Sequence, residues 1–467
     1  MRPRLYTLTS SLHGEMAPDP RQEPFIREIE AALGVEFDCR GDDFSDFRPG
    51  LDELIYVRTG GTEGLFLELL GKKLKAGRQR FRVKPGMTQW DQPMVRLLAS
   101  GQSNSLAASM EILSWLQREG FAGEILHGSP AAIAARLRST PESADNITFP
   151  GANNPVSAPG TQEIASPGAK DPFSAPGILR QSQDDRGGNA LENRMIEPLT
   201  PGTFGRPLKG KRFGVIGRPS DWLISSGVDY AAAKETLGAE LIDIPIEELV
   251  DEVRSLGQAS PVTSLKPLNV PRYGRSISEK DWNGAQDIYQ ALQHLVRRYR
   301  LDGLTLRCFD LLTTLHNTGC LALAILNSEG ITATCEGDIP AMLSMAVARE
   351  LTGSASFQVN LSRIEGDRLL FAHCTVPLSI VRNYCYDTHF ESGIGVAIHG
   401  ELPEGPVTLF KIAPDLGHLF RQPAKLVANP YGDNLCRTQV LVEAPGAAEY
   451  FLKKPLGNHH ILVPGTL

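Results

Sequence analysis

The first 138 residues alternate between short apolar runs and segments in which apolar residues recur every three or four positions. The run LDELIYVRTGG at 51–61 is typical of a buried strand, and SNSLAASMEILSWLQREG at 103–120 has the spacing of an amphipathic helix. Strands that alternate with helices favour a parallel sheet covered on both faces. We therefore predict an amino-terminal α/β domain over residues 1–138.

This alternation stops over residues 139–210, which are rich in proline, glycine and serine and contain few periodic apolar positions. Such a composition buries too little apolar surface to offset the chain entropy lost on folding. We predict that this segment is an insertion or linker.

A second α/β pattern covers residues 211–354. RFGVIG (212–217) and AELIDIPI (239–246) have the pattern of strands on either side of a helix that opens near Asp229, which is a βαβ unit. Gly214 and Gly217 lack the third glycine of a dinucleotide fingerprint, so we predict a Rossmann-like layer without a nucleotide. Further along lie the expected strands GLTLRCFD and ITATCEG and the expected helices DWNGAQDIYQALQHLVRRYR, TGCLALAILN and DIPAMLSMAVARELTG.

Residues 355–467 change to alternating strands separated by turn residues, which indicates antiparallel pairing. SFQVNLSRIEGDRLLFAHCTV and GVAIHGELPEGPVTLFKIA each read as a hairpin. The pattern as a whole predicts an α/β protein with two Rossmann-like layers built on parallel sheets, followed by a mainly antiparallel β domain.

Composition narrows the classes of function. A chain of 467 residues is too long for one ordinary core, and its net charge of -7 would repel a phosphate backbone, so we expect no nucleic-acid partner. No apolar run approaches the length of a membrane span, and the amino terminus lacks the apolar region of a signal peptide. The seven cysteines contain no C-x-x-C pair. We expect reduced thiols, a cytoplasmic location and no membrane partner.

Acidic side chains follow two of the predicted strands in the second layer. Asp310 comes directly after GLTLRCF, and Glu336 and Asp338 follow ITATC. If the two strands are parallel neighbours, their tips lie roughly 5–10 Å apart, close enough to share one divalent cation. A second interpretation is structural, because Asp338 precedes Ile339 and Pro340 at the start of a helix, where aspartate is a common cap.

Histidines of the carboxyl-terminal region offer a further ligand. His373 has two interpretations, a core residue or a ligand, and His399 alternates within a strand in a way that predicts a solvated position. His459 and His460 are adjacent in an expected strand, so at least one of them must face the buried side.

The order of CEGD before a helix, FAHCTVP, THFESGIGVAIHGEL and the terminal GNHH resembles the L-fucose isomerase and L-arabinose isomerase superfamily. The resemblance covers most of residues 211–467 and implies an aldose-ketose isomerase that works through a cis-enediol. It implies Mn²⁺, or another divalent cation such as Mg²⁺ or Co²⁺, held by Asp310, Asp338 and His459. Asp310, Asp338 and Glu336 would then be catalytic, and Glu336 replaces Asp310 as the first carboxylate if the alignment shifts.

The expected substrate is a free or modified monosaccharide, and the resemblance implies a homo-oligomer, a trimer or hexamer. Further expected contacts to the sugar come from the THFESG turn, the tandem histidine and two earlier residues: His373, His389, Glu391, Ser392, Arg307 and His460. Two alternative functions stay open, a non-catalytic sugar-binding protein and a metal-dependent hydrolase.

Overall fold

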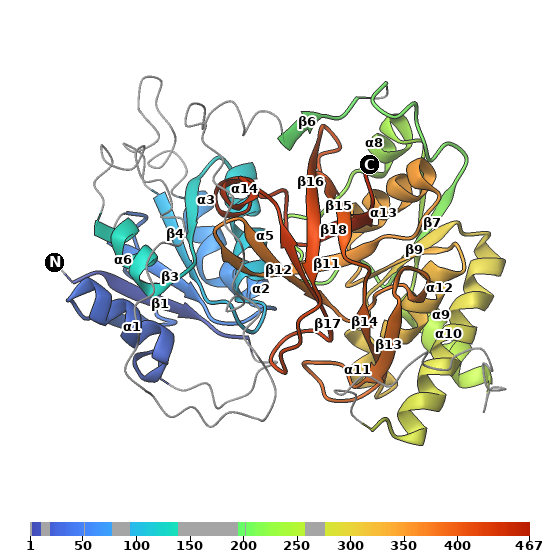
Figure 1. The fold of residues 1–467 in the computed structure, drawn as a ribbon, viewed down its shortest axis with the longest axis horizontal. Helices are drawn as coiled ribbons and strands as arrows, with labels where there is room; N and C mark the ends of the chain where they lie inside the picture. Colours follow the sequence, from blue (N-terminus) through green and yellow to red (C-terminus); the bar gives the residue numbers. More distant parts are fainter. Residues whose placement is uncertain are drawn as a thin grey trace.

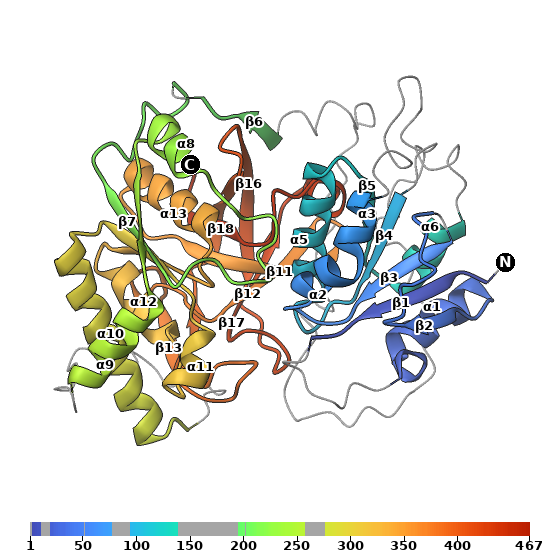
Figure 2. The same cartoon turned by 180° about the vertical axis from the view of Figure 1, so that it is seen from behind.

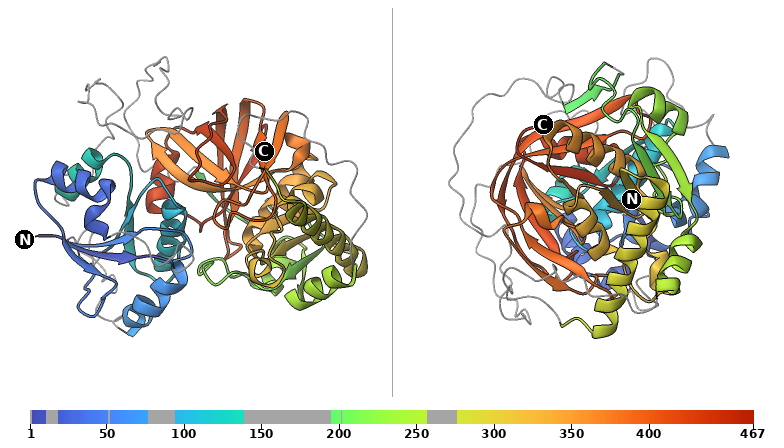
Figure 3. Two further views of the ribbon diagram at one scale, coloured as in Figure 1. Left: turned by 90° about the horizontal axis from the view of Figure 1, so that it is seen from below. Right: turned by 90° about the vertical axis from the view of Figure 1, so that its right-hand side faces the viewer.

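A β-barrel lies between two α/β units (Figures 1 and 2). The computed structural model describes residues 2–10, 19–50, 52–76, 94–138, 195–200, 202–256 and 276–467. Figure 3 shows the amino-terminal unit on one side of the barrel and the second unit, with its long helix, on the other.

The amino-terminal unit is an all-parallel five-stranded sheet with the strand order β2-β1-β3-β4-β5. This confirms the parallel sheet predicted from the alternating pattern. Its strands are β1 (Arg4–Leu8), β2 (Asp38–Gly41), β3 (Glu53–Val57), β4 (Met94–Ala99) and β5 (Ala122–Leu126). The helices of the unit are α1 (Pro24–Leu33), α2 (Glu63–Phe66), α3 (Lys72–Ala76), α5 (Ser105–Arg118) and α6 (Pro130–Arg138).

The second unit is a parallel four-stranded sheet with the order β10-β9-β7-β8. Its strands are β7 (Arg212–Ile216), β8 (Glu240–Ile244), β9 (Gly303–Leu306) and β10 (Thr332–Cys335). The helices around it are α8 (Tyr230–Thr236), α9 (Ile246–Leu256), α10 (Glu279–Tyr299), α11 (Asp310–Thr314), α12 (Cys320–Ser328) and α13 (Ile339–Thr352). The pairing of β9 with β10 meets the condition on which a shared strand-tip site depends.

Antiparallel strands of the carboxyl-terminal region form the barrel. The order is β15-β18-β11-β12-β17-β16, and an additional pairing of β15 with β16 closes the ring. These strands are β11 (Phe357–Glu365), β12 (Arg368–His373), β15 (Gly405–Ile412), β16 (His418–Ala428), β17 (Thr438–Glu443) and β18 (His460–Pro464), with α14 (Ala447–Lys453) following β17. Closure leaves few free strand edges in this region.

One predicted hairpin is correct and the other is wrong. β11 and β12 pair as expected, but β14 (Ala397–Glu401) pairs with β13 (Asn383–Asp387) rather than with β15. β15 instead forms a hairpin with the next strand, β16, and also pairs with β18, which is distant in the chain, so the short turn between β14 and β15 does not determine its partners.

The segment 139–210 is described only in part, because residues 139–194 and residue 201 lie outside the described ranges. A short strand of this segment, β6 (Ile196–Pro198), pairs with β16 at the outside of the barrel. Among the described helices, none combines the length and the apolar character that a membrane crossing requires.

A single hydrophobic cluster joins the amino-terminal unit to the barrel. It contains Leu97 of β4, Ile112 of α5 and Phe371 of β12. Helix α5 is buried along nearly its whole length, which is why its sequence is apolar on more than one face. The two regions therefore pack as one body, with α5 at their boundary.

Candidate functional site

The tips of β9 and β10 lie side by side, with Leu306 opposite Cys335. Glu336 and Gly337 follow β10 with left-handed backbone angles, φ of 65° and 71°. A non-glycine residue in this region is strained and is usually held there by its surroundings. The Gly337 N–H donates to Leu306 O at 3.0 Å, and Ser220 N–H donates to Glu336 O at 3.0 Å. These bonds fix the turn that carries the Glu336 side chain.

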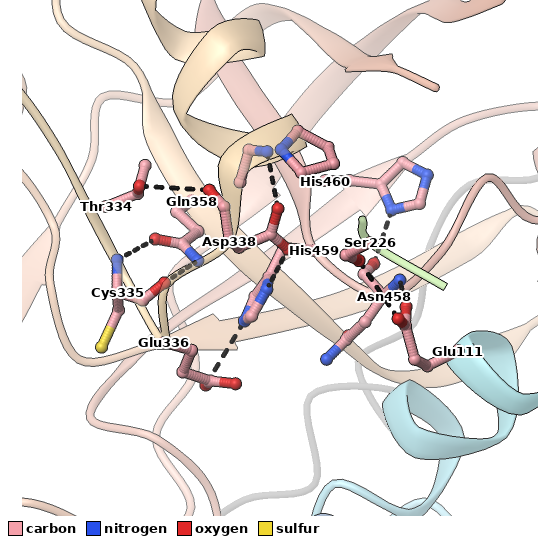
Figure 4. A network of polar contacts seen from close by, with 12 residues as sticks. Glu111, Ser226, Thr334, Cys335, Glu336, Asp338, Gln358, Asn458, His459 and His460 are labelled. Atoms are coloured by element: carbon pink, nitrogen blue, oxygen red, sulfur yellow. Dashed lines mark hydrogen bonds and ion pairs between the residues drawn. The ribbon is translucent and has the colours of Figure 1, made fainter. Parts of the chain in front are cut away.

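Glu336, His373 and His459 form a buried cluster in which one ligand atom from each lies within 4.8 Å of the others. Glu336 follows β10, His373 ends β12, and His459 directly precedes β18. Figure 4 shows the His459 ring between Glu336 and Asp338. The second parallel sheet and the barrel thus each supply part of the cluster.

Asp338 is both a helix cap and a partner of the cluster. Its Oδ1 accepts from the Ala341 N–H at 2.7 Å at the start of α13, and its Oδ2 accepts from His459 Nδ1 at 2.9 Å. The side chain is fully buried. A carboxylate that receives the Nδ1 proton fixes the tautomer of the imidazole and directs its Nε2 toward a ligand.

His459 Nε2 is buried and has no hydrogen-bond partner among the described residues, and it lies 3.4 Å from Glu336 Oε1. Burial opposes a positive charge on this ring, but Glu336 and Asp338 outweigh that effect and raise the pKa of His459 to about 10. The two carboxylates thus create a place for a positive charge at Nε2. A divalent cation would supply that charge in place of a proton.

His373 is the neutral member of the cluster. Burial, together with the neighbouring His459, lowers the pKa of His373 to about 4. Its Nδ1 contacts the Thr375 hydroxyl at 3.0 Å, which leaves Nε2 for another partner. One carboxylate oxygen and two imidazole nitrogens form a donor set that suits a first-row divalent ion such as Mn²⁺ or Co²⁺.

Glu336 is held in its ionised form. Burial raises its pKa, but the charge of His459, with His373 and the Trp222 indole, outweighs burial and keeps the net value below the ordinary one. Trp222 Nε1 donates to Glu336 Oε2 at 2.6 Å. This indole also packs edge-on against Phe309, with ring centroids 4.8 Å apart. The Trp222 contact restricts the direction in which the carboxylate points.

A pocket next to the cluster is lined by all three parts of the fold. Its polar lining residues in the amino-terminal unit are Glu63 and Asn104, and those elsewhere are Glu336, Asn360, His373, His389, Glu391 and Asn458. Four buried side-chain atoms of this lining have no hydrogen-bond partner in the described part of the chain: Glu63 Oε2, Asn104 Oδ1, Asn360 Oδ1 and Asn458 Oδ1. Unpaired buried polar atoms are costly, so their convergence points to a ligand with several hydroxyl groups.

The pocket lining is rich in carboxyl groups. Burial, reinforced by the charge of Glu336, raises the pKa of Glu391 to about 7. Burial also raises the pKa of Glu63 well above its ordinary value. Among the described lining residues there is no lysine or arginine. Glu63 and Glu391, whose pKa values are raised, therefore line the same pocket as the ionised Glu336.

Asp310 does not join the cluster. Arg307 Nε donates to its Oδ1 at 3.0 Å, and Arg307 Nη2 contacts Asp221 at 2.7 Å. The Asp310 side chain is 34% exposed, in contrast to the buried Glu336. Of the two carboxylates considered for the first metal position, the structure brings Glu336, not Asp310, to His459.

The remaining predicted residues divide into two groups. His389 and Glu391 line the pocket, and Ser392 contacts His389 Nδ1 at 3.0 Å. His460 lies elsewhere, among the rings of Phe420, Tyr450 and Phe451, and both of its ring nitrogens are hydrogen-bonded. It has no nitrogen left for a sugar.

The predicted solvated position of His399 is wrong. The residue is only 4% exposed, and its ring stacks on Tyr431 with centroids 4.9 Å apart. The two-stranded pair β13-β14 covers the barrel, so both faces of β14 are buried and alternation along it does not indicate solvent.

The sequence patterns did not indicate the contribution of α5. The cap residue Asn104 is followed at positions +3, +4 and +7 by Ala107, Ala108 and Glu111, a spacing that places these residues on one side of α5. The first three line the pocket, and Asn104 Nδ2 donates to Glu391 Oε1 at 2.9 Å. The row of small and polar residues along an otherwise apolar helix was the sequence feature that could have indicated this contribution.

No model of a known protein family matches the chain. It is 22% identical over 232 residues to a sulfoquinovose isomerase of Priestia aryabhattai, a match that covers 48% of this chain and 52% of that protein. A sulfoquinovose isomerase of Priestia megaterium gives the same values. One from a Clostridium species is 26% identical over 185 residues, 38% of this chain and 40% of that protein. The chain spans about half the length of the first two curated relatives it matches.

Proposed function

We propose that this protein is an aldose-ketose isomerase that uses a divalent cation, with Mn²⁺ expected and Mg²⁺ or Co²⁺ as substitutes. The observation that carries the proposal is the buried set of Glu336, His373 and His459. In the described part of the chain, His459 Nε2 and several polar atoms of the adjacent pocket have no hydrogen-bond partner. The names of the relatives and the resemblance of the CEGD and GNHH motifs support the same reaction class.

Isomerisation of an aldose requires a proton to leave C2 and a proton to arrive at C1, through a cis-enediol. A bound cation would polarise the carbonyl and the adjacent hydroxyl, which lowers the cost of the charge that develops on oxygen. Glu336 and the two imidazoles would hold it. With the cation bound, Asp338 would accept the Nδ1 proton of His459 and so leave Nε2 free to be a ligand.

Glu391 is our candidate for the proton carrier. It lines the pocket, and among the described residues Asn104 donates to one of its carboxylate oxygens, Oε1. Its pKa of about 7 suits a group that must both accept and release a proton near neutrality. Asp338 is a poorer candidate because its two oxygens already receive the Ala341 and His459 protons.

The acidic lining favours an uncharged aldose over a sulfonated one. A sulfonate keeps its negative charge at any ordinary pH. Burying it near the ionised Glu336, without a cationic side chain among the described lining residues, would be unfavourable. We therefore propose a neutral monosaccharide as the preferred substrate, which separates this protein from the sulfoquinovose named for its relatives.

The first test is a set of turnover measurements after removal of metal with a chelator. We expect ketose formation from neutral aldoses only when Mn²⁺ is restored, and a higher kcat/KM for a neutral aldohexose than for sulfoquinovose. Preference for sulfoquinovose would overturn the proposed substrate class but not the proposed reaction.

A second experiment follows the transferred proton: when the reaction runs in heavy water, deuterium should enter the sugar at C1 or C2. Bound Mn²⁺ without such exchange would favour the hydrolase alternative, and sugar binding without Mn²⁺ or turnover would favour the binding protein.

A pair of variants distinguishes the two possible first carboxylates. Glu336→Gln should lower Mn²⁺ affinity and turnover by at least about 100-fold, because it removes a charged ligand. Asp310→Asn should leave both within about threefold of wild type, because its carboxylate is bound to Arg307 outside the cluster. The reverse result would return the metal position to Asp310. Mn²⁺ titration and initial rates provide the two measurements.

A further inference from the structure

Glu111 is a buried acid of α5 that the proposed reaction does not use. Its side chain is fully buried, and it is the acid within an otherwise uncharged stretch from Ser105 to Gln117. It belongs to the amino-terminal unit, yet Ser225, Ser226 and Asn458, which donate hydrogen bonds to it, lie in the rest of the chain. Figure 4 shows the carboxylate pointing from α5 toward Ser226 and Asn458.

The donors come from two loops that flank the cluster. Glu111 Oε1 accepts from the Ser225 N–H at 2.7 Å and from the Ser226 hydroxyl at 3.1 Å. Glu111 Oε2 accepts from the Asn458 N–H at 2.8 Å. Asn458 directly precedes His459, so this bond fixes the backbone immediately before the imidazole.

Lys411 completes the arrangement from the barrel. It is fully buried in β15, and its Nζ donates to the backbone oxygen of His459 at 2.6 Å. Gly457 lies between the two charged groups with φ of 97°, and a Cβ there would lie 3.1 Å from Glu111 Oε2 and 3.5 Å from Lys411 Cε. The backbone around His459 is thus held by the Glu111 carboxylate on one side and by the Lys411 side chain on the other.

We propose that Glu111 is a positioning residue through which the amino-terminal unit fixes the His459 segment for cation binding. Asp338 sets the direction of the imidazole ring, while Glu111 and Lys411 fix the peptide that carries it. The part of this inference that concerns the cation rests on the proposed function. The part that concerns the backbone does not.

The test compares Glu111→Gln with wild type by two measurements on the full chain. Hydrogen exchange of the peptide containing residues 456–461 should become at least about tenfold faster, because an amide nitrogen replaces one accepting oxygen. The dissociation constant for Mn²⁺ should rise about 10-fold, as for other groups that support a metal ligand indirectly. A merely structural role would lower the melting temperature without these two local effects.

His127→Gln is the matched control. His127 is also buried and also crosses from the amino-terminal unit to the barrel, where its Nε2 accepts from the Ile364 N–H at 3.1 Å, but Ile364 is not adjacent to the cluster. This variant should leave exchange at 456–461 and Mn²⁺ affinity unchanged. If Glu111→Gln does not fold, Gly457→Ala disturbs the same contact from the opposite side and should give the same two effects.

The outcomes separate the two proposals. Unchanged exchange at 456–461 in Glu111→Gln overturns the positioning role whatever the metal result. Faster exchange with unchanged Mn²⁺ affinity also overturns it, because the backbone would then not matter to the ligand. Failure of the wild-type protein to bind Mn²⁺ overturns the proposed function, and the exchange measurement still decides whether Glu111 fixes the segment.

Discussion

Asp338 serves a structural and a chemical purpose with separate oxygens. Oδ1 caps α13 and Oδ2 receives the His459 proton, so the cap and the orientation of the ligand depend on one side chain. Burial raises the pKa of Asp338, but Lys411 and His459 outweigh that effect and keep the net pKa below the ordinary value. The two interpretations of this residue from the sequence are therefore compatible.

Asp338→Asn should separate the two purposes. Asparagine caps helices well, so the change in unfolding free energy should stay below about 1 kcal/mol. Its amide would donate to His459 Nδ1, which favours the tautomer with the proton on Nε2 and blocks that nitrogen. Mn²⁺ affinity should fall about 10- to 100-fold. Titration with Mn²⁺ and thermal unfolding measure the two effects.

Asp229→Asn is the control for this substitution. Asp229 caps α8 through the Ala232 N–H at 2.9 Å and lies on the surface away from the cluster. The variant should match Asp338→Asn in its small effect on capping and should bind Mn²⁺ like wild type. Wild-type affinity in Asp338→Asn would leave Asp338 with the cap alone.

The sequence identified those site residues whose side-chain direction follows directly from their position along the backbone. Asp338 and His459 were predicted as ligands and lie in contact at the cluster, since an acid after a strand tip and a histidine before a buried strand have little choice of direction. Asp310 is also at a strand tip, but Arg307, three residues earlier, binds its carboxylate. His373 was predicted to contact sugar, and its place among the cluster atoms depends on a distant strand pairing.

At the scale of elements, the turn between β10 and α13 is the most constrained connection of the site. A Cβ at Gly337 would lie 2.4 Å from Arg218 O and 2.7 Å from Pro219 Cα, in addition to the cost of φ at 71°. The loop after β7 thus packs directly against the turn that presents Glu336. Neither backbone can shift without moving the carboxylate.

Gly337→Ala should therefore disrupt the site as well as destabilise the protein. We expect a loss of more than about 3 kcal/mol in unfolding free energy, because a backbone clash adds to left-handed strain. Gly353→Ala at the other end of α13 has a similar φ of 70° with nothing within 4 Å, so it should cost only about 1 kcal/mol. Chemical denaturation compares them, and equal losses would show that the contact with Arg218 is unimportant.

The elements were largely predictable because each has a local signal. The periodic apolar residues identified the strands and helices of both parallel sheets, and Asp338, Pro340 and Gly353 mark the ends of α13. The partners of β14 and β15 were not predictable in this way. β14 pairs with the preceding β13 in a separate two-stranded sheet, and β15 pairs with the next strand, β16, and with the distant β18, so the short turn between β14 and β15 does not decide their partners.

At the scale of the whole molecule, the site depends on contact between the amino-terminal unit and the barrel. Asn104 reaches Glu391, Glu111 reaches Asn458, and His127 reaches Ile364. The first two contacts lie at the pocket and the third lies farther along the same boundary. A change that removes one of the first two contacts should therefore affect the site, whereas a change at the third should affect only the stability of the boundary.

His127 makes this boundary sensitive to acid. Its Nδ1 donates to Ala99 O at 2.9 Å and its Nε2 accepts from Ile364, so both bonds require the neutral ring. Burial lowers the pKa of His127 to about 4, against an ordinary value of 6.5. Below pH 6.5 the His127 ring is protonated in the unfolded chain but stays neutral in the folded chain. The free energy of unfolding therefore falls as the pH decreases toward 4.

Wild type should lose about 2 kcal/mol of stability from this group between pH 7 and pH 5. The glutamine of His127→Gln does not titrate, so the unfolding free energy of this variant should fall by about 2 kcal/mol less than that of wild type between pH 7 and pH 5. The variant should be less stable than wild type at pH 7, because glutamine replaces both ring contacts imperfectly. Denaturant unfolding at several pH values measures the difference, and the other buried histidines contribute equally to both proteins. Parallel pH profiles for the two proteins would mean that His127 does not control the acid sensitivity of the boundary.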